Sequence, residues 1–114
     1  MKQVEKISVN ELSEMAQKMY GGLVKGVVDL EKSLLVVDAE MHVDEEQYLL
    51  ENGSKQADLW GINLYPEKFD SEEFIEFDSM INIRPSAKNM SRSVDNATTR
   101  MKIVKLVSKK VTNE

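Results

Sequence analysis

A chain of 114 residues with 41% hydrophobic and 31% charged residues has the size and composition of one globular domain, which excludes a disordered or collagen-like chain. The absence of cysteine excludes a disulfide framework and a thiolate nucleophile or metal ligand, and no apolar run approaches membrane-spanning length. The polar N-terminus does not resemble a signal peptide, so we expect a single domain over residues 1–114 that is located in the cytoplasm, with no membrane contact.

The net charge of −5 conceals a separation of charge along the chain. Residues 38–51 and 70–78 are rich in Asp and Glu and contain no Lys or Arg, whereas residues 84–110 carry eight Lys or Arg and the single acid Asp95. Complementary potentials speed and orient encounter between proteins. The basic end of one copy could therefore meet the acidic middle of another, and a homodimer is the simplest assembly that this pattern predicts.

The first predicted element is a helix over residues 9–20. Ser8 and Glu11 have the spacing of a capping box, and Gly21 with Gly22 provides a C-terminal stop. Between these signals, apolar residues recur at helical spacing, namely Leu12, Met15, Ala16 and Met19.

Two segments rich in Val and Leu, residues 23–30 and 34–41, are separated by three residues and predict a β-hairpin. Because side chains alternate between the two faces of a strand, one set is expected to point into the core: Val24, Val28, Leu30, Leu35, Val37 and Met41. The opposite face of the hairpin then carries Lys25, Asp29, Asp38, Glu40 and His42.

Asp44, with Gln47 three residues later, predicts the start of a short helix that ends at Asn52 and Gly53. Residues 59–65 and 74–84 then alternate between apolar and polar with a period of two, which predicts two half-buried strands. The inward residues would be Trp60, Ile62, Leu64, Ile75, Phe77, Ile81 and Ile83. The outward residues would be Asn63, Tyr65, Glu76, Asp78, Asn82 and Arg84.

Residues 86–93 lack periodicity and predict a mobile loop, after which a helix begins near Ser93 or Asp95. Its expected apolar stripe is Ala97, Met101, Val104, Val107 and Val111. The order α-β-β-α-β-β-α predicts a two-layer α+β domain with a four-stranded, mainly antiparallel sheet. We expect the outer helices to cover one face of this sheet and the polar face to stay open.

The candidate catalytic residues are Glu40, His42, Glu76 and Asp78. Glu40 and His42 lie two apart on an expected strand, so an imidazole beside carboxylates could act as a general base or hold a divalent metal. A lone His lacks a second nitrogen ligand, and the alternative is a solvated strand end. We therefore assign no metal and no cofactor.

The candidate binding residues are Asn63, Tyr65, Asn82, Arg84 and Arg92. Arg84 and Arg92 flank a loop that enters a helix N-terminus, where an anion could bind, but the loop lacks the glycines of phosphate-binding loops. Alternatively, Arg84 pairs with Glu76 or Asp78 across the sheet. The basic last helix could contact a nucleic-acid backbone, although the acidic remainder of the chain opposes this interaction.

Two blocks of unusual composition, DLWGINLYP at residues 58–66 and FDSMINIRP at residues 77–85, together with AEMHVDEEQYLLEN at 39–52, resemble a family of small uncharacterised prokaryotic proteins. The resemblance covers nearly the whole chain and implies no activity and no site residues.

The preferred hypothesis is a non-enzymatic protein-interaction module whose open sheet face contacts another protein or a second copy. The alternatives are a small hydrolase-like enzyme with an acid/His site on the same face, in which Arg84 steadies an anion, and nucleic-acid binding through the basic C-terminal segment.

Overall fold

The Val-rich hairpin predicted from the sequence forms the centre of a five-stranded sheet in the computed structural model, which describes residues 1–113. The strands follow the order β1 (Lys2–Gln3), β4 (Leu34–Val37), β3 (Val24–Asp29), β5 (Leu59–Leu64) and β6 (Ile75–Glu76), and all neighbours pair antiparallel. The helices are α1 (Val9–Gln17), α2 (His42–Glu51) and α3 (Ala97–Lys110). A separate parallel pair joins β2 (Ile7–Ser8) to β7 (Val111–Thr112). The α+β class is confirmed, with five strands in place of the expected four.

One face of the sheet carries the main hydrophobic core. Trp60, Ile62 and Leu64 of β5 share this face with the inward residues of β3 and β4, as alternation predicts. Helix α1, held at its start by the capping box of Ser8 and Glu11, contributes Leu12 and Ala16 to the cluster. Helix α3 contributes Ile103, Leu106 and Val107. The two outer helices therefore cover this face, as expected.

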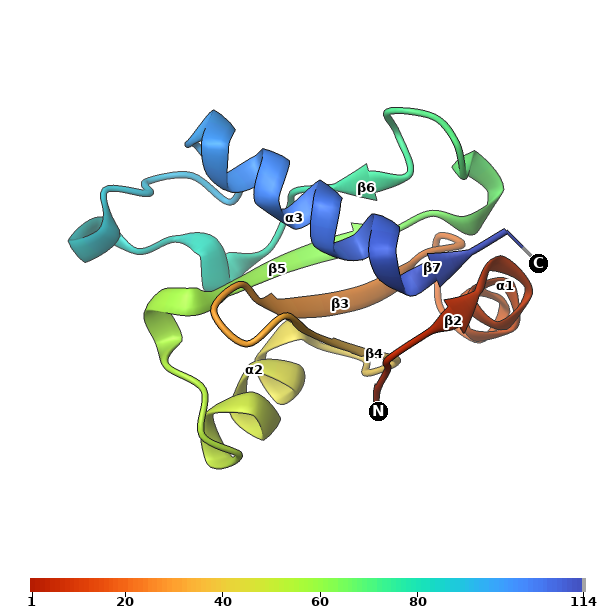
Figure 1. Ribbon diagram of the computed structural model, residues 1–114, viewed down its shortest axis with the longest axis horizontal. Coiled ribbons are helices and arrows are strands. Elements are labelled where there is room, and N and C mark those ends of the chain that lie inside the picture. Colours follow the sequence, from red (N-terminus) through yellow and green to blue (C-terminus); the bar gives the residue numbers. More distant parts are fainter. Residues whose placement is uncertain (114) are drawn as a thin grey trace.

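The opposite face of the sheet is also covered, and the expectation that it stays open is wrong. Val27, Val36 and Leu59 point to this face and pack against Leu49 of α2 in a second, smaller cluster. Figure 1 shows α2 and α3 on opposite sides of the sheet. The fold thus has three layers, because apolar residues occupy some of the outward positions of the hairpin and of β5.

Strand β4 ends earlier than expected, and helix α2 begins earlier. Asp38 has a positive φ of 70°, which turns the chain out of the sheet directly after Val37. Helix α2 then starts at His42 after the N-cap residue Met41, and not at Asp44. Met41 is therefore exposed instead of buried in the core, and His42 lies on a helix instead of a strand.

The expected strand over residues 74–84 is wrong beyond Glu76. After β6 the chain forms a 3₁₀ turn at Met80–Asn82, and the side chain of Asn82 takes the place of a neighbouring strand. Its Oδ1 accepts a hydrogen bond from Gly61 N at 2.8 Å, and its Nδ2 donates to Gly61 O at 2.9 Å. Asn82 is consequently buried, Ile81 joins the second cluster, and Ile83 is exposed.

Arg84 also bonds the backbone along the edge of β5. Its guanidinium donates hydrogen bonds to the carbonyl oxygens of Gln56 and Leu59, and it lies 4.2 Å from the centre of the Trp60 ring. A cation over an aromatic face is attracted by the ring quadrupole. The prediction that Arg84 pairs with an acid on an exposed face is wrong, because its side chain is buried against backbone and indole.

Helix α3 begins at Ala97, after the N-cap Asn96, whose Oδ1 accepts from Thr99 N at 3.0 Å. The predicted apolar stripe is only partly correct. Val107 and Val111 are buried, but Ala97, Met101 and Val104 are exposed. The helix buries Ile103 and Leu106 in their place.

Helix α2 carries a buried carboxyl group at Glu45. Its Oε2 accepts a hydrogen bond from Ala39 N at 3.2 Å, while Oε1 has no partner among the described residues. Burial raises the pKa of Glu45 to about 9, because the charged form loses its hydration. Glu45 is therefore protonated in the folded protein at neutral pH.

Replacing Asn82 with alanine should lower the free energy of unfolding by about 3 kcal/mol, because both polar backbone groups of Gly61 lose their partner in a buried position. Urea denaturation measures this loss. The matched control is Asn10→Ala on the exposed side of α1, which should change stability by less than about 0.5 kcal/mol. Equal stabilities of the two variants would contradict the structural role of the Asn82 amide.

Glu45 should make the protein less stable as the pH rises. The folded state holds the proton that the unfolded state releases above the unfolded pKa, so the free energy of unfolding falls between roughly pH 5 and pH 9, by up to about 1.4 kcal/mol per pH unit. Glu45→Gln should flatten this decline and raise stability at pH 8, as measured by urea denaturation across pH. Glu51→Gln, an exposed change on the same helix, should keep the decline.

Candidate functional site

Most of the candidate residues gather in one cleft of about 490 Å³, between the N-terminus of α2 and the segment that follows β6. The candidates that line the cleft are Glu40, His42, Asn63, Tyr65, Glu76, Asp78 and Arg92. Lys25 and Ser79 complete its polar lining, and Leu23, Met41, Val43, Met80 and Ile81 its apolar lining. Asn82 and Arg84 lie outside it. The structure therefore brings these residues together in a cleft, and not on the flat sheet face that the sequence predicts.

His42 enters the cleft from the first turn of α2 and is largely buried. Its Nε2 lies 2.8 Å from the carbonyl oxygen of Ile62. Because a carbonyl oxygen can only accept, Nε2 carries the proton, and in the neutral ring Nδ1 keeps its lone pair. Burial lowers the pKa of His42, and the positive charge of Lys25 lowers it further, while the bond to Ile62 opposes both effects.

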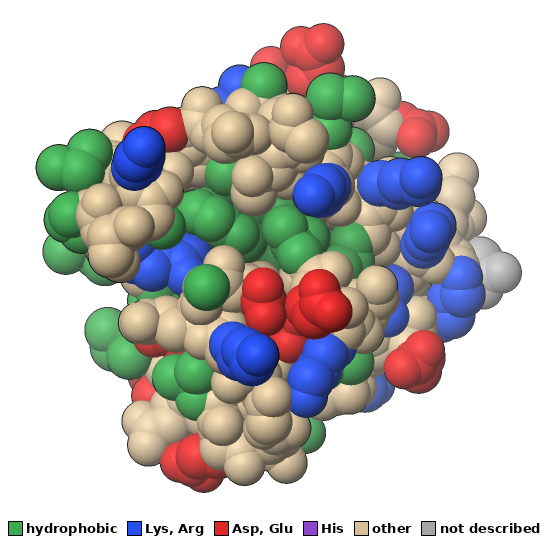
Figure 2. All heavy atoms as spheres, turned by 60° about the vertical axis from the view of Figure 1, so that its left-hand side comes forward, with side chains coloured by type: hydrophobic (Ala, Val, Ile, Leu, Met, Phe, Trp, Pro, Cys, Tyr) green, Lys and Arg blue, Asp and Glu red, His purple; other side chains and the backbone are tan. Residues whose placement is uncertain are grey.

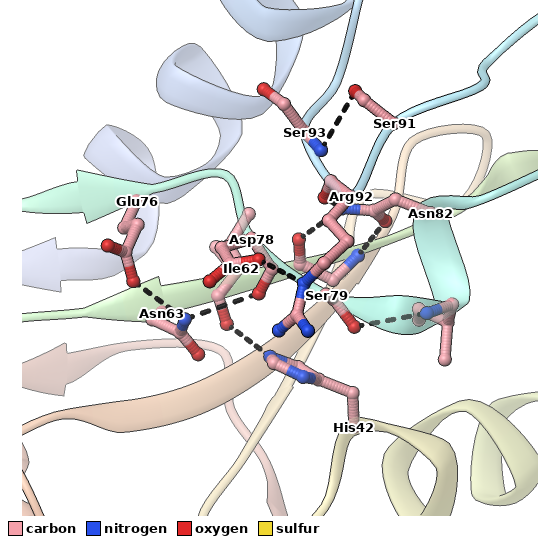
Figure 3. Close-up of polar contacts among 12 residues, drawn as sticks. His42, Ile62, Asn63, Glu76, Asp78, Ser79, Asn82, Ser91, Arg92 and Ser93 are labelled. Carbon is pink, nitrogen blue, oxygen red and sulfur yellow. Dashed lines mark hydrogen bonds and ion pairs between the residues drawn. The ribbon is translucent and has the colours of Figure 1, made fainter.

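A hydrogen-bond network connects β5 to β6 along the floor of the cleft (Figure 3). Nδ2 of Asn63 donates to Oε1 of Glu76 at 2.9 Å and to the carbonyl oxygen of Asp78 at 3.2 Å. The Tyr65 hydroxyl donates to the same Glu76 oxygen at 2.9 Å. Burial, followed by the interaction with Glu76, raises the pKa of Tyr65, so its hydroxyl remains a donor. Oδ1 of Asn63 is buried without a partner among residues 1–113.

Arg92 and Asp78 form an ion pair, with Nε of Arg92 2.6 Å from Oδ1 of Asp78. The backbone of Arg92 is fixed because its carbonyl oxygen accepts from Ser79 N and from the Asn82 amide, each at 3.0 Å. Asn89 holds the same loop by donating to the carbonyl oxygens of Asn82 and Ser93. The loop expected to be mobile is therefore bonded in place. Figure 3 shows Arg92 and Asp78 approaching from one side and His42 from the other.

The rim of the cleft is apolar and exposed. Met41 exposes 57% and Met80 65% of their surface, and Val43 is also exposed. Sequence reasoning missed these three residues and Ser79 as part of the site. Met41 was expected in the core, and its true place follows only from the turn at Asp38 that takes the chain out of the sheet.

Glu40 and His42 line the same cleft, but among residues 1–113 no three His, Asp or Glu side chains converge closely enough to hold a metal ion. Within the same residues, no helix combines the length and the apolar character needed to cross a membrane.

The basic C-terminal segment contributes to a separate groove of about 380 Å³. Its basic lining consists of Lys6, Lys102, Lys105, Lys109 and Lys110. Figure 2 shows basic side chains gathered along one border of a face, beside a hollow with a hydrophobic floor. Lys6 donates a hydrogen bond to the carbonyl oxygen of Lys109, and Lys109 and Lys110 lie in the last turn of α3, so these three lysines also neutralise the negative end of the helix.

The architecture and the cleft define a small α+β domain with a preformed polar site. Residues 3–110 match the family described as protein of unknown function (DUF5674), and the chain belongs to this family. No curated protein and no solved structure matches the chain significantly. The family description assigns no activity.

The imidazole of His42 should titrate with a midpoint below 6.5, because burial disfavours its charged form. NMR of the ring nitrogens can follow this directly, since the chain contains one histidine, and it should show the proton on Nε2 at neutral pH. Because the pKa of His42 is lower in the folded protein, acidification through about 6.5 protonates the imidazole of the unfolded chain before that of the folded one. The free energy of unfolding therefore falls as the pH is lowered. The urea-unfolded protein is the control, and a folded midpoint at or above 6.5 would contradict the buried, neutral ring.

Proposed function

We propose that the protein is a non-enzymatic interaction module that binds a segment of a partner polypeptide in the cleft beside α2. One observation carries this proposal: the cleft combines a floor of fixed polar groups of both charges with a rim of exposed methionines. The volume of about 490 Å³ lies in the range of functional ligand sites.

The acids of the floor are used to position other groups. Glu76 accepts from Asn63 and Tyr65, and Asp78 is paired with Arg92. Such engaged carboxylates stiffen a binding surface and are poorly placed to transfer protons.

The charged groups that remain available to a ligand are both positive and negative. Lys25 and Glu40 line the cleft and have no ion-pair partner among residues 1–113. Arg92 keeps more than half of its side chain exposed. A polypeptide presents backbone donors and acceptors together with charges of either sign, and it fits this lining better than a ligand of uniform charge.

The rim supports a polypeptide ligand for a second reason. Met, Tyr and Arg are enriched in protein interfaces, and flexible thioether side chains adapt to the partner that they contact. Met41 and Met80 stand on opposite walls, one at the start of α2 and the other in the 3₁₀ turn after β6. They could close over an apolar side chain of the bound segment.

A hydrolase-like enzyme is the second candidate, because a neutral His42 with an unprotonated Nδ1 shares the cleft with Glu40 and Asp78. The ring hydrogen bond, however, runs to a backbone carbonyl and not to a carboxylate that could orient it. The interaction module accounts for more of the cleft lining.

A random peptide library displayed on phage tests the proposal. Peptides selected on the wild-type protein should lose at least tenfold in affinity for the double variant Met80→Glu/Arg92→Ala, because the change removes one rim contact and one charge. Met90→Glu, an equally exposed methionine outside the cleft, is the matched control and should bind as wild type. Chemical-shift perturbation by the same peptides should centre on His42 and Asn63.

Peptides that bind both variants as tightly as wild type would show that the cleft is not the binding site. Failure to select any peptide, together with hydrolysis of p-nitrophenyl esters that His42→Gln abolishes, would establish the enzyme in its place.

A further inference from the structure

Helix α3 carries a second apolar stripe that its own fold leaves uncovered. Ala97, Met101, Val104 and Ser108 are exposed and follow one another at spacings of four, three and four residues, and the stripe ends at Val111 of β7, which is buried. Met101 exposes 71% and Val104 43% of their surface, whereas the buried side of the helix is formed by Ile103, Leu106 and Val107. A four-three spacing is that of helices that pack against another helix.

The stripe continues onto the segment around β6, which lies beside α3 in Figure 1. A hollow of about 790 Å³ is lined by Phe77, Ala97, Met101 and Val104. A second hollow of about 480 Å³ is lined by Phe69, Phe74, Ile75, Phe77, Val104 and Val111. The two hollows share Phe77 and Val104, so they form one continuous surface, which we name the α3–β6 surface.

The two ends of the α3–β6 surface carry opposite charge. Arg100, Lys102 and Lys105 line the first hollow, toward the N-terminal half of α3. Asp70 and Glu72 line the second hollow, where Ser108 and Val111 place it beside the end of the helix. Among the side chains that line the two hollows, the basic ones therefore belong to the first hollow and the acidic ones to the second.

We propose that the α3–β6 surface binds a second copy of this chain, with the two α3 helices antiparallel about a two-fold axis near Phe77 and Val104. A two-fold axis places the basic end of each copy against the acidic end of the other. This single symmetry operation therefore pairs both ends with residues of opposite charge. A foreign acidic helix would satisfy only Arg100, Lys102 and Lys105 and would face like charge at Asp70 and Glu72. The polarity of the surface thus favours self-association.

The side chains of the surface suit such a pairing. Ala97 and Ser108 are small and allow helices to approach closely, while Met101 and Val104 fill the space between them. A stable dimer buries about 800 Å² on each partner, which is roughly an eighth of the 6728 Å² that this chain exposes.

The proposed dimer leaves the polar cleft free. In residues 75–78 the chain alternates, with Ile75 and Phe77 on the α3–β6 surface and Glu76 and Asp78 in the cleft. The cleft and the dimer surface consequently lie on opposite sides of this segment, and each copy in a dimer keeps its own cleft. The inference does not depend on what the cleft binds.

Two charge-reversed variants test the dimer by sedimentation equilibrium. Lys102→Glu/Lys105→Glu makes the basic end acidic, and Asp70→Asn/Glu72→Lys makes the acidic end basic, with asparagine chosen because Asp70 has a positive φ of 71°. Wild type should have twice the monomer mass of 13.0 kDa. Each variant alone should dimerise at least tenfold more weakly, and an equimolar mixture should recover dimers, because both of its contacts are again complementary.

Lys18→Glu/Lys55→Glu, two exposed lysines outside the surface, is the matched control and should remain dimeric. Circular dichroism confirms that every variant is folded. Monomeric wild type at 200 µM, variants that dimerise as well as wild type, or a mixture that stays monomeric would each overturn the proposal.

Discussion

The pair of hydrogen bonds between the Asn82 amide and the backbone of Gly61 fixes the edge of the sheet on which the rest of the structure depends. The contact leaves no room for a side chain at Gly61, since a Cβ there would lie 2.5 Å from Cβ of Ser79. An amide side chain in the place of a strand ends the sheet without leaving a row of open backbone groups. It also turns the chain back over β5, so that Asp78, Ser79 and Met80 form one wall of the cleft.

The same contact explains where sequence reasoning succeeds and where it fails. Alternation correctly predicts the central hairpin and β5, because every second side chain of these strands enters the larger hydrophobic cluster. Alternation also predicts a strand through Asn82 and Arg84, since polar residues at a period of two resemble a solvated face. A single sequence cannot distinguish an amide or guanidinium that faces water from one that bonds a buried backbone. The cleft was nevertheless predictable in part, because Asn63 and Glu76 pair on neighbouring strands with the expected parity, and Tyr65 directly follows β5.

Helix α3 shows a different limit of sequence reasoning. It contains two apolar stripes, and the pattern with regular spacing, through Met101 and Val104, is the one that the monomer leaves exposed. Burial in the monomer selects Ile103 and Leu106, which lie closest to the sheet. The periodicity of a helix reports every face that is apolar, and it does not say whether the covering surface belongs to the same chain.

The four residues from Ile75 to Asp78 connect the two surfaces, because alternate side chains point to the α3–β6 surface and to the cleft. A substitution at Glu76, which pairs with Asn63 of β5, would disturb this local pairing and thereby affect both surfaces. Met80 and Met101, in contrast, each touch only one surface. The functions of the two surfaces can therefore be separated only through residues at their outer edges, where a side chain can change without moving the strand that both surfaces share.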